Sequence, residues 1–238
     1  MQHRTQQNQL LQRLGGASVL FIALAGLLDL VANQLATAKA SPTGPTDAYL
    51  AYLQANPFLW QTMLLWATSA LLGMVGVQAV ARRLEPYQPV WAGIARTWGI
   101  GALLVSALFD LLSRLPFYLA RTLPPSAMEA WLGARGAFLQ VPVAVGMVQM
   151  LLLALLGLSL GMASRSGGVS RVTCSLSFGY GATYLLILLL GPGLGLNTPV
   201  QGVLSALAPF LQLGWLIWAG VELIRFPDPV EGAPSQAA

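Results

Sequence analysis

The stretch LLALLGLSLG at residues 152–161 decides the fold class of this chain. It is apolar on all sides and does not alternate apolar with polar residues, so it does not fit a strand of a membrane β-barrel. It lies within a longer apolar run at residues 137–162. Because about 20 helical residues cross the roughly 30 Å hydrocarbon core of a bilayer, this run predicts a transmembrane helix.

Five further runs of the same kind are present along the chain. The six predicted spans cover residues 15–36, 58–80, 99–120, 137–162, 172–190 and 203–224. Segments rich in Pro, Gly and Ser, such as SPTGPTD at 41–47 and GPGLGLNTP at 191–199, separate them as turns. The sequence therefore predicts one all-α domain, an integral membrane bundle of six transmembrane helices, with tails at residues 1–14 and 226–238.

The composition agrees with a membrane location. Of 238 residues, 12 are Lys or Arg and 8 are Asp or Glu, while 56% are hydrophobic. Soluble domains carry about 25% charged residues, so a nucleic-acid-binding protein or a cytosolic enzyme is excluded. The only histidine, His3, lies in the N-terminal tail, which excludes haem or metal ligation by histidine inside the membrane. The sequence predicts no cofactor and no metal site.

The first apolar run has two interpretations. Arg4 and Arg13 precede it and AKA follows at residues 38–40, as in a cleavable signal peptide. Asp29 and Asn33, however, interrupt the run where a signal peptide is uniformly apolar. We therefore expect a retained transmembrane helix.

The distribution of basic residues predicts the orientation, since cytoplasmic loops carry more Lys and Arg. With the N-terminus inside, the inner set is Arg4, Arg13, Arg82, Arg83, Arg96, Arg165, Arg171 and Arg225, and the outer set is Lys39, Arg114, Arg121 and Arg135. This ratio of eight to four predicts that both termini lie in the cytoplasm.

Two of the connecting segments are long enough to hold short helices. Residues 46–56 and 126–134 each begin with a hydroxyl residue typical of an N-cap, Thr46 and Ser126, followed by an acid in the first turn. We expect two short interfacial helices at the outer surface. Nearby aromatic residues suit an interfacial belt, namely Tyr49, Tyr52, Trp60 and Trp131.

Charged side chains inside the spans are the candidate functional residues, because each costs about 2.5–3.5 kcal/mol on insertion scales. Asp29 and Asn33 share one face of the first span, and Asp110 and Arg114 share one face of the third. Both pairs fall in the outer half of the membrane in the predicted orientation. Gln61 and Gln140 lie at comparable depth in the second and fourth spans.

These residues support two hypotheses. In the first, they line a polar pocket that opens outward and binds a ligand through Asp29, Asn33, Gln61, Asp110, Arg114 and Gln140. In the second, Asp110 neutralises Arg114 within one helix and the amides only hold helices together through hydrogen bonds. The second hypothesis requires no ligand.

The remaining charged and small residues have structural explanations. Glu222, at the inner end of the last span, is expected to reach the water at the headgroups. Arg82 and Arg83 fit topology determinants. Gly157 and Gly161 form a G-x-x-x-G pattern, which favours close packing of helices within the protein.

No catalytic constellation is complete. A Ser-His dyad and a zinc protease helix both need histidines in the spans. An intramembrane aspartyl protease needs two carboxylates that share a proton, which Arg114 opposes by keeping Asp29 and Asp110 ionised. We therefore expect a non-enzymatic membrane protein that binds a small molecule or a lipid. A transporter or channel and an accessory subunit of a larger membrane complex are the alternatives, and the expected partners are membrane lipids and, in the last case, another membrane subunit.

Several fragments in this order resemble a known family. They are the basic tail, DAYLAYLQANPF at 47–58, AVARRLEP at 79–86, and LPPSAMEAWL at 123–132. The chain resembles, over residues 15–225, the uncharacterised bacterial multi-pass family catalogued as domain of unknown function 4386. The resemblance implies a six-helix bacterial inner-membrane protein and no established activity.

Overall fold

The computed structural model describes residues 2–36, 45–193 and 199–226, which form helices and short connections with no strand among them. The elements in chain order are α1 (Gln2–Leu35), α2 (Thr46–Ala55), the 3-10 helix η1 (Pro57–Gln61), α3 (Thr62–Leu84), α4 (Pro89–Thr122), α5 (Pro125–Ser164), α6 (Arg171–Leu188), the π-helix η2 (Leu189–Gly193) and α7 (Pro199–Arg225).

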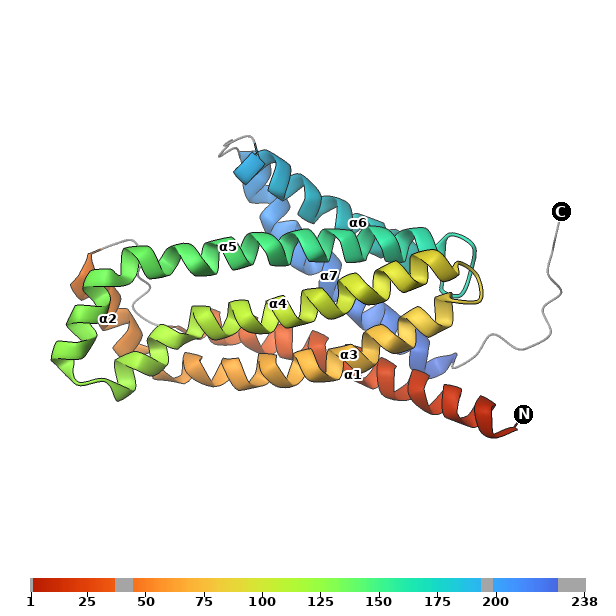
Figure 1. Ribbon diagram of the computed structural model, residues 1–238, viewed down its shortest axis with the longest axis horizontal. Coiled ribbons are helices and arrows are strands. Elements are labelled where there is room, and N and C mark those ends of the chain that lie inside the picture. The colour runs from red at the N-terminus through yellow and green to blue at the C-terminus, as the bar shows by residue number, and fades with distance from the viewer. Residues whose placement is uncertain (1, 37–44, 194–198, 227–238) are drawn as a thin grey trace.

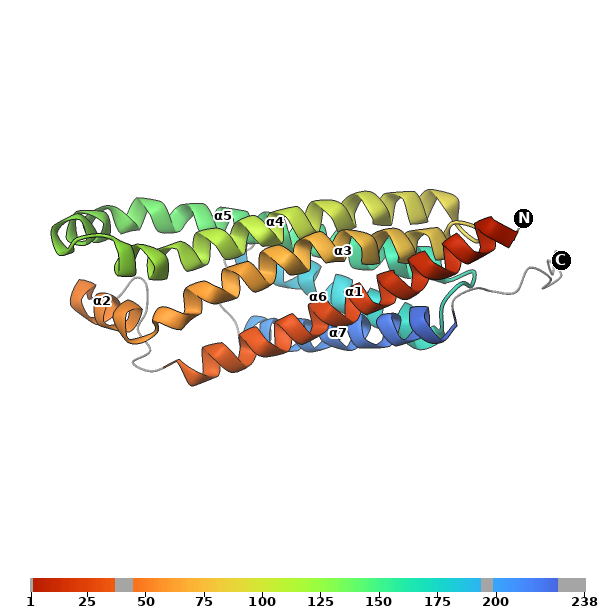
Figure 2. The same ribbon diagram turned by 90° about the horizontal axis from the view of Figure 1, so that it is seen from below.

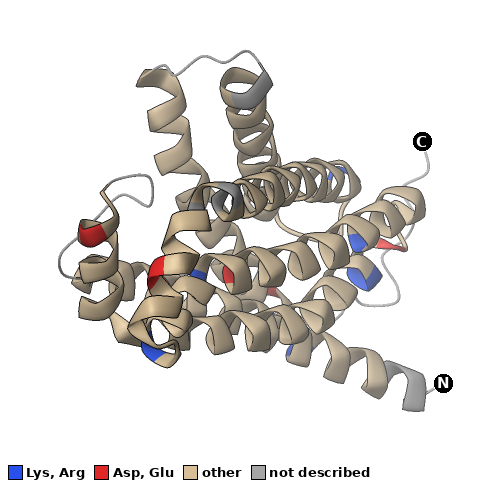
Figure 3. Cartoon of the chain, turned by 60° about the vertical axis from the view of Figure 1, so that its left-hand side comes forward, with Lys and Arg blue, Asp and Glu red and all other residues tan. Residues whose placement is uncertain are grey.

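Six helical segments are long and apolar enough to cross a membrane, which confirms the six predicted spans. They are Gln6–Leu35, Pro57–Leu84, Pro89–Thr122, Gln140–Ser164, Arg171–Gly191 and Pro199–Arg225. Large apolar side chains lie exposed along all of them, as expected where lipid replaces water. Lys, Arg, Asp and Glu are sparse along the helices (Figure 3). The protein is therefore a multi-pass helical membrane protein.

The six long helices form a closed ring in chain order. Each one packs against the next, from α1 with α3 through α6 with α7, and α7 packs back against α1. The N-terminus of α1 and the C-terminus of α7 lie at one end of the bundle, the terminal end (Figure 1). Helix α2 lies at the opposite end, the α2 end (Figures 1 and 2).

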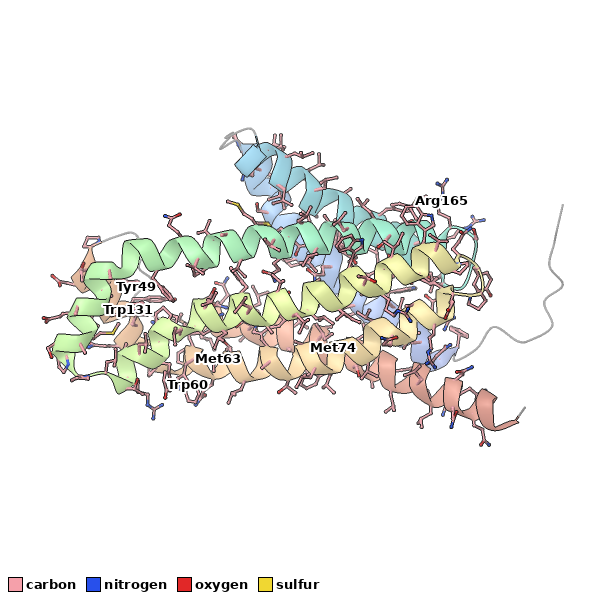
Figure 4. All side chains as sticks on the ribbon, viewed as in Figure 1. Tyr49, Trp60, Met63, Met74, Trp131 and Arg165 are labelled. Carbon is pink, nitrogen blue, oxygen red and sulfur yellow. The ribbon has the colours of Figure 1, made fainter. Side chains whose placement is uncertain are left out.

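A packed apolar cluster covers the α2 end. Tyr49 and Leu53 of α2 are buried there with Leu59, Phe117 and Leu132. Tyr49, Trp60 and Trp131 gather at this end, far from Arg165 (Figure 4). Tyr49 is thus part of a packed core, although the sequence predicted an interfacial aromatic residue.

Both segments that were predicted to be short helices are helical. Residues 46–55 form α2, as expected. Residues 126–134 are the first turns of α5, which has 40 residues in all. These first turns lie across the α2 end at a steep angle to the rest of α5 (Figures 1 and 2), and the segment Gln140–Ser164 is the span. The predicted N-caps are also wrong, because the helices begin after Pro45 and Pro124 without a side-chain cap.

Close approach of helices packs the terminal half of the ring. A Cβ added at Gly157 of α5 would lie 2.8 Å from the backbone nitrogen of Gly181 on α6, and one added at Gly161 would lie 2.7 Å from the ring of Phe178. The G-x-x-x-G pattern therefore serves packing within the chain, as predicted.

The ring opens toward the α2 end. From the terminal end, α6 rises away from α5, and α7 begins far from the point where α1 ends (Figure 1). The ends of α6 and α7 stand apart from the rest of the bundle (Figure 3). The opening leaves space between α1 and α7.

Candidate functional site: a polar cleft at the α2 end

A buried ion pair joins two predicted site residues from different helices. Nη2 of Arg114 on α4 lies 2.8 Å from Oδ1 of Asp29 on α1, and the two side chains are 12% and 17% exposed. Asn33, one turn along α1 from Asp29, accepts a hydrogen bond from Nη1 of Arg114 at 3.2 Å. Its own Nδ2 donates to Oδ2 of Asp29 at 3.1 Å. Asp29, Asn33 and Arg114 thus form one connected network, as the pocket hypothesis predicted.

Asp110 has a different role from the one expected in the hypothesis without a ligand. That hypothesis paired it with Arg114 inside the same helix, but Arg114 makes its ion pair with Asp29, and the structure records no hydrogen bond or ion pair of Asp110 within the described chain. The charges of both Asp29 and Arg114 act on the Asp110 carboxyl group. The four-residue spacing alone therefore does not explain the charges in this half of the bundle. Asp29, Asp110 and Arg114 carry a formal charge of −1 when all three are ionised.

The two glutamines lie apart from this network. Gln61, the last residue of η1, and Gln140 on α5 are both exposed. Neither one hydrogen bonds with Asp29, Asn33 or Arg114. The structure therefore brings together Asp29, Asn33 and Arg114, places Asp110 within electrostatic range, and leaves Gln61 and Gln140 outside.

Helix α2 closes over the network from the end of the bundle. Tyr52 packs edge-on against Phe117 of α4 with ring centroids 5.4 Å apart. Burial raises the pKa of the Tyr52 phenol above its ordinary value, and the positive charge of Arg114 opposes that rise. The guanidinium of Arg114 thus pairs with the carboxylate of Asp29, and its charge also acts on the hydroxyl of Tyr52.

A large cleft adjoins the network between α1 and α7. Its volume is about 540 Å³. Asp29 and Asn33 line it together with Gln34 and Ser205, and all four lie toward the α2 end. The remaining walls are largely apolar residues of α1 and α7, and Trp66 and Gln212 also line the cleft. The cleft therefore has a polar mouth and an apolar body.

A metal site has no support within residues 2–36, 45–193 and 199–226, because these hold no group of three or more His, Cys, Asp or Glu side chains that fits an ion. The chemistry of the network is instead that of hydrogen bonding and charge.

A second buried ion pair lies at the terminal end, and the sequence did not predict it. Arg83 of α3 and Glu222 of α7 are 7% and 9% exposed, and Nη2 of Arg83 lies 3.7 Å from Oε1 of Glu222. Glu222 also accepts hydrogen bonds from the backbone nitrogen of Ser170 at 2.7 Å and from Oγ1 of Thr173 at 2.6 Å. Glu222 is thus held inside the protein, whereas the sequence had led us to expect that it reaches the water at the headgroups.

The turn between α5 and α6 completes this second site. Nε of Arg83 donates to the carbonyl oxygen of Gly168, and Nη1 donates to that of Phe226. Gly168 has a φ of +86°, a conformation that side chains rarely allow, so glycine is needed to direct this carbonyl. Arg82 beside Arg83 is exposed. The sequence did carry a signal for this pair, because Glu222 is a lone acid in the apolar run of the last span, and a charge in such a place needs a partner.

Comparison of the chain with models of known families, with curated proteins and with solved structures finds no match. The resemblance to the family of unknown function therefore stays a prediction.

Proposed function

We propose that the protein is a non-enzymatic integral membrane protein that binds an amphiphilic small molecule or lipid in the cleft between α1 and α7. The observation that carries the proposal is the cleft itself, with a polar mouth and a long apolar body. Its volume of about 540 Å³ lies in the range of pockets that enclose small ligands, about 300–1,000 Å³. A ligand with one polar group and one apolar part fits this division.

The acceptors at the mouth favour a polar group on the ligand that donates hydrogen bonds. The carboxylate of Asp29 and the side-chain amide of Asn33 line the cleft, and Asp29 is already paired with Arg114. A ligand that carries an amine or hydroxyl group donates hydrogen bonds to such acceptors.

Photo-crosslinking in membranes tests this proposal. A photoreactive amino acid replaces Leu213, which lines the cleft, or Val203, which lies on the same helix but is exposed outside it. We expect a discrete ligand adduct at Leu213, identified by its mass, and only bulk phospholipid at Val203. The substitution Ala206→Trp fills the cleft without touching the ion pair and is expected to abolish the discrete adduct. Identical bulk-lipid adducts at both positions would contradict the proposal.

A transporter is the second candidate function. The observation that favours it is the position of the two ion pairs, Asp29–Arg114 and Arg83–Glu222, near opposite ends of the bundle. In a transporter, two such ion pairs could break and form in alternation, so that the two ends of the bundle open in turn. Movement of the molecule identified at Leu213 across proteoliposomes would support transport, and binding without movement would support a binding protein.

The same proposal places the protein in the bacterial inner membrane with both termini in the cytoplasm. The excess of Arg on the terminal side and the resemblance described above support it. Single cysteines at Gln6 and Ser235, in a chain with Cys174 replaced by serine, report the orientation. Labelling of either one by a membrane-impermeant reagent added outside intact cells would reverse it.

A further inference from the structure

A second, smaller cavity lies at the centre of the helix ring. It has a volume of about 80 Å³ and is lined by residues from all six long helices. We call it the central chamber. Trp66 and Gln212 line both this chamber and the cleft, so the two spaces adjoin.

Three hydrogen-bond donors that line the chamber have no partner in the described chain. They are Nε1 of Trp66, the hydroxyl of Tyr180 and Nε1 of Trp215. Tyr180 and Trp215 are 1% and 6% exposed, and their rings pack edge-on with centroids 5.8 Å apart. Burying an unpartnered donor costs free energy, so such groups are rare in proteins, and three on one cavity need an explanation.

Three of the other polar side chains that line the chamber are engaged, and a fourth, Arg96, is exposed. Ser69 donates to the carbonyl oxygen of Leu65 at 2.8 Å, and Gln149 donates to Ser106 at 2.9 Å. Oε1 of Gln212 accepts a hydrogen bond from Tyr184 at 2.7 Å. Within the described residues, the three aromatic donors therefore have no protein partner, and the lining of the chamber is largely apolar.

The chemistry of these donors defines the group that satisfies them. An indole N–H donates and does not accept, so its partner must be an acceptor. A carbonyl oxygen accepts two hydrogen bonds and brings no donor that the chamber would leave unpaired. The volume of about 80 Å³ exceeds the roughly 30 Å³ that one water molecule occupies.

We propose that the central chamber is a binding site for the carbonyl group of an otherwise apolar molecule, a ketone, an ester or a quinone, held by the two neighbouring donors Tyr180 and Trp215. The apolar part of this molecule extends into the adjoining cleft along Ile22 and Leu216, which line both spaces. The inference concerns the chamber and does not depend on which molecule occupies the polar mouth of the cleft.

Two probes with the same tail test the site. Decylbenzoquinone carries two carbonyl acceptors and decylbenzene carries none. Each is titrated at matched mole fraction into lipid nanodiscs that hold the full-length protein, and the shift of the melting temperature gives the half-saturating amount. We expect a saturable rise with decylbenzoquinone only. An equal rise with decylbenzene would show an apolar cavity without a carbonyl site and would overturn the proposal, as would the absence of a rise with the quinone.

Three variants connect the result to the donors. Tyr180→Phe and Trp215→Phe each remove one donor, and loss of one hydrogen bond is expected to weaken decylbenzoquinone binding about fivefold. Trp60→Phe is the matched control, because Nε1 of Trp60 is also buried without a partner but lies at the α2 end outside both cavities.

The melting temperature without probe shows that each variant is folded, and either chamber variant alone suffices for the test. Binding by both chamber variants as tight as the wild type overturns the proposal. The crosslinking experiment at Leu213 does not use these donors, so the cleft and the chamber can fail independently.

Discussion

Replacement of Arg114 by leucine tests the polar network most directly. The guanidinium is 12% exposed and neutralises Asp29 across two helices. Its removal leaves Asp29 without its cation and also removes the positive charge that acts on Asp110. Loss of one partner from a buried pair costs about 3–5 kcal/mol, because the remaining charge stays buried and uncompensated. We expect Arg114→Leu to lower the free energy of unfolding by an amount in this range.

A double-mutant cycle separates the two carboxyl groups. Asp29→Asn combined with Arg114→Leu should recover about 2 kcal/mol relative to the sum of the single losses, because the double variant removes both charges of the pair and leaves neither one buried without the other. Asp110→Asn combined with Arg114→Leu is the matched control and should recover less, because Arg114 makes its ion pair with Asp29. Reversible unfolding in mixed detergent micelles measures all five variants. Additive losses for the Asp29 cycle, or a larger recovery in the Asp110 cycle, would refute the interhelical pair.

Three further substitutions have clear expected outcomes in the same unfolding assay. Arg83→Leu should lower the free energy of unfolding by about 3–5 kcal/mol, because it leaves the buried charge of Glu222 without its cation. Arg82→Leu, at an exposed position, should change it by no more than about 0.5 kcal/mol. Equal effects of the two substitutions would contradict the buried pair. Gly157→Ala should cost about 1–3 kcal/mol through its contact with α6, while a Cβ at Gly133 meets nothing within 4 Å, so Gly133→Ala should be neutral or stabilising. Tyr180→Phe should not lower the stability of the ligand-free protein, because the hydroxyl that it removes has no hydrogen-bond partner. A loss above about 1 kcal/mol would mean that this hydroxyl makes a hydrogen bond in the ligand-free protein.

The spans were predictable because the bilayer imposes their length. A run of about 20 apolar residues has few alternatives to a transmembrane helix, so six runs gave six helices. The boundary of a helix outside the membrane has no such constraint. Residues 126–134 and the span beginning near residue 137 were predicted as two helices, and they are joined in α5, whose first turns lie at a steep angle to the rest (Figures 1 and 2).

The polar network was predictable in its members and only partly in its pairing. A charge inside a span is costly, so the sequence identified Asp29, Asp110 and Arg114 as residues that need partners. Spacing along one helix favoured Asp110 as the partner of Arg114. The distance between Arg114 and Asp29 depends on how α1 and α4 are rotated and placed, and this is not encoded in the spacing of either helix.

The Arg83–Glu222 pair shows the same limit at the other end of the bundle. Arg82 and Arg83 are neighbours in sequence and equivalent by charge, but successive residues point about 100° apart around a helix. Only Arg83 faces the interior, where it pairs with Glu222 and donates a hydrogen bond to the carbonyl oxygen of Gly168. The orientation of α3 therefore decides which arginine is structural.

Both ion pairs bridge across an intervening helix of the ring. Asp29 and Arg114 join α1 to α4, between which α3 lies, and Arg83 and Glu222 join α3 to α7, between which α1 lies. Neighbouring helices in a membrane can associate by van der Waals packing alone, but helices separated by another helix need long side chains to connect them. The two pairs thus hold the ring together near its two ends without filling its centre. This arrangement explains how a tightly packed terminal half and an open cleft coexist in one bundle, and why the central chamber persists between them.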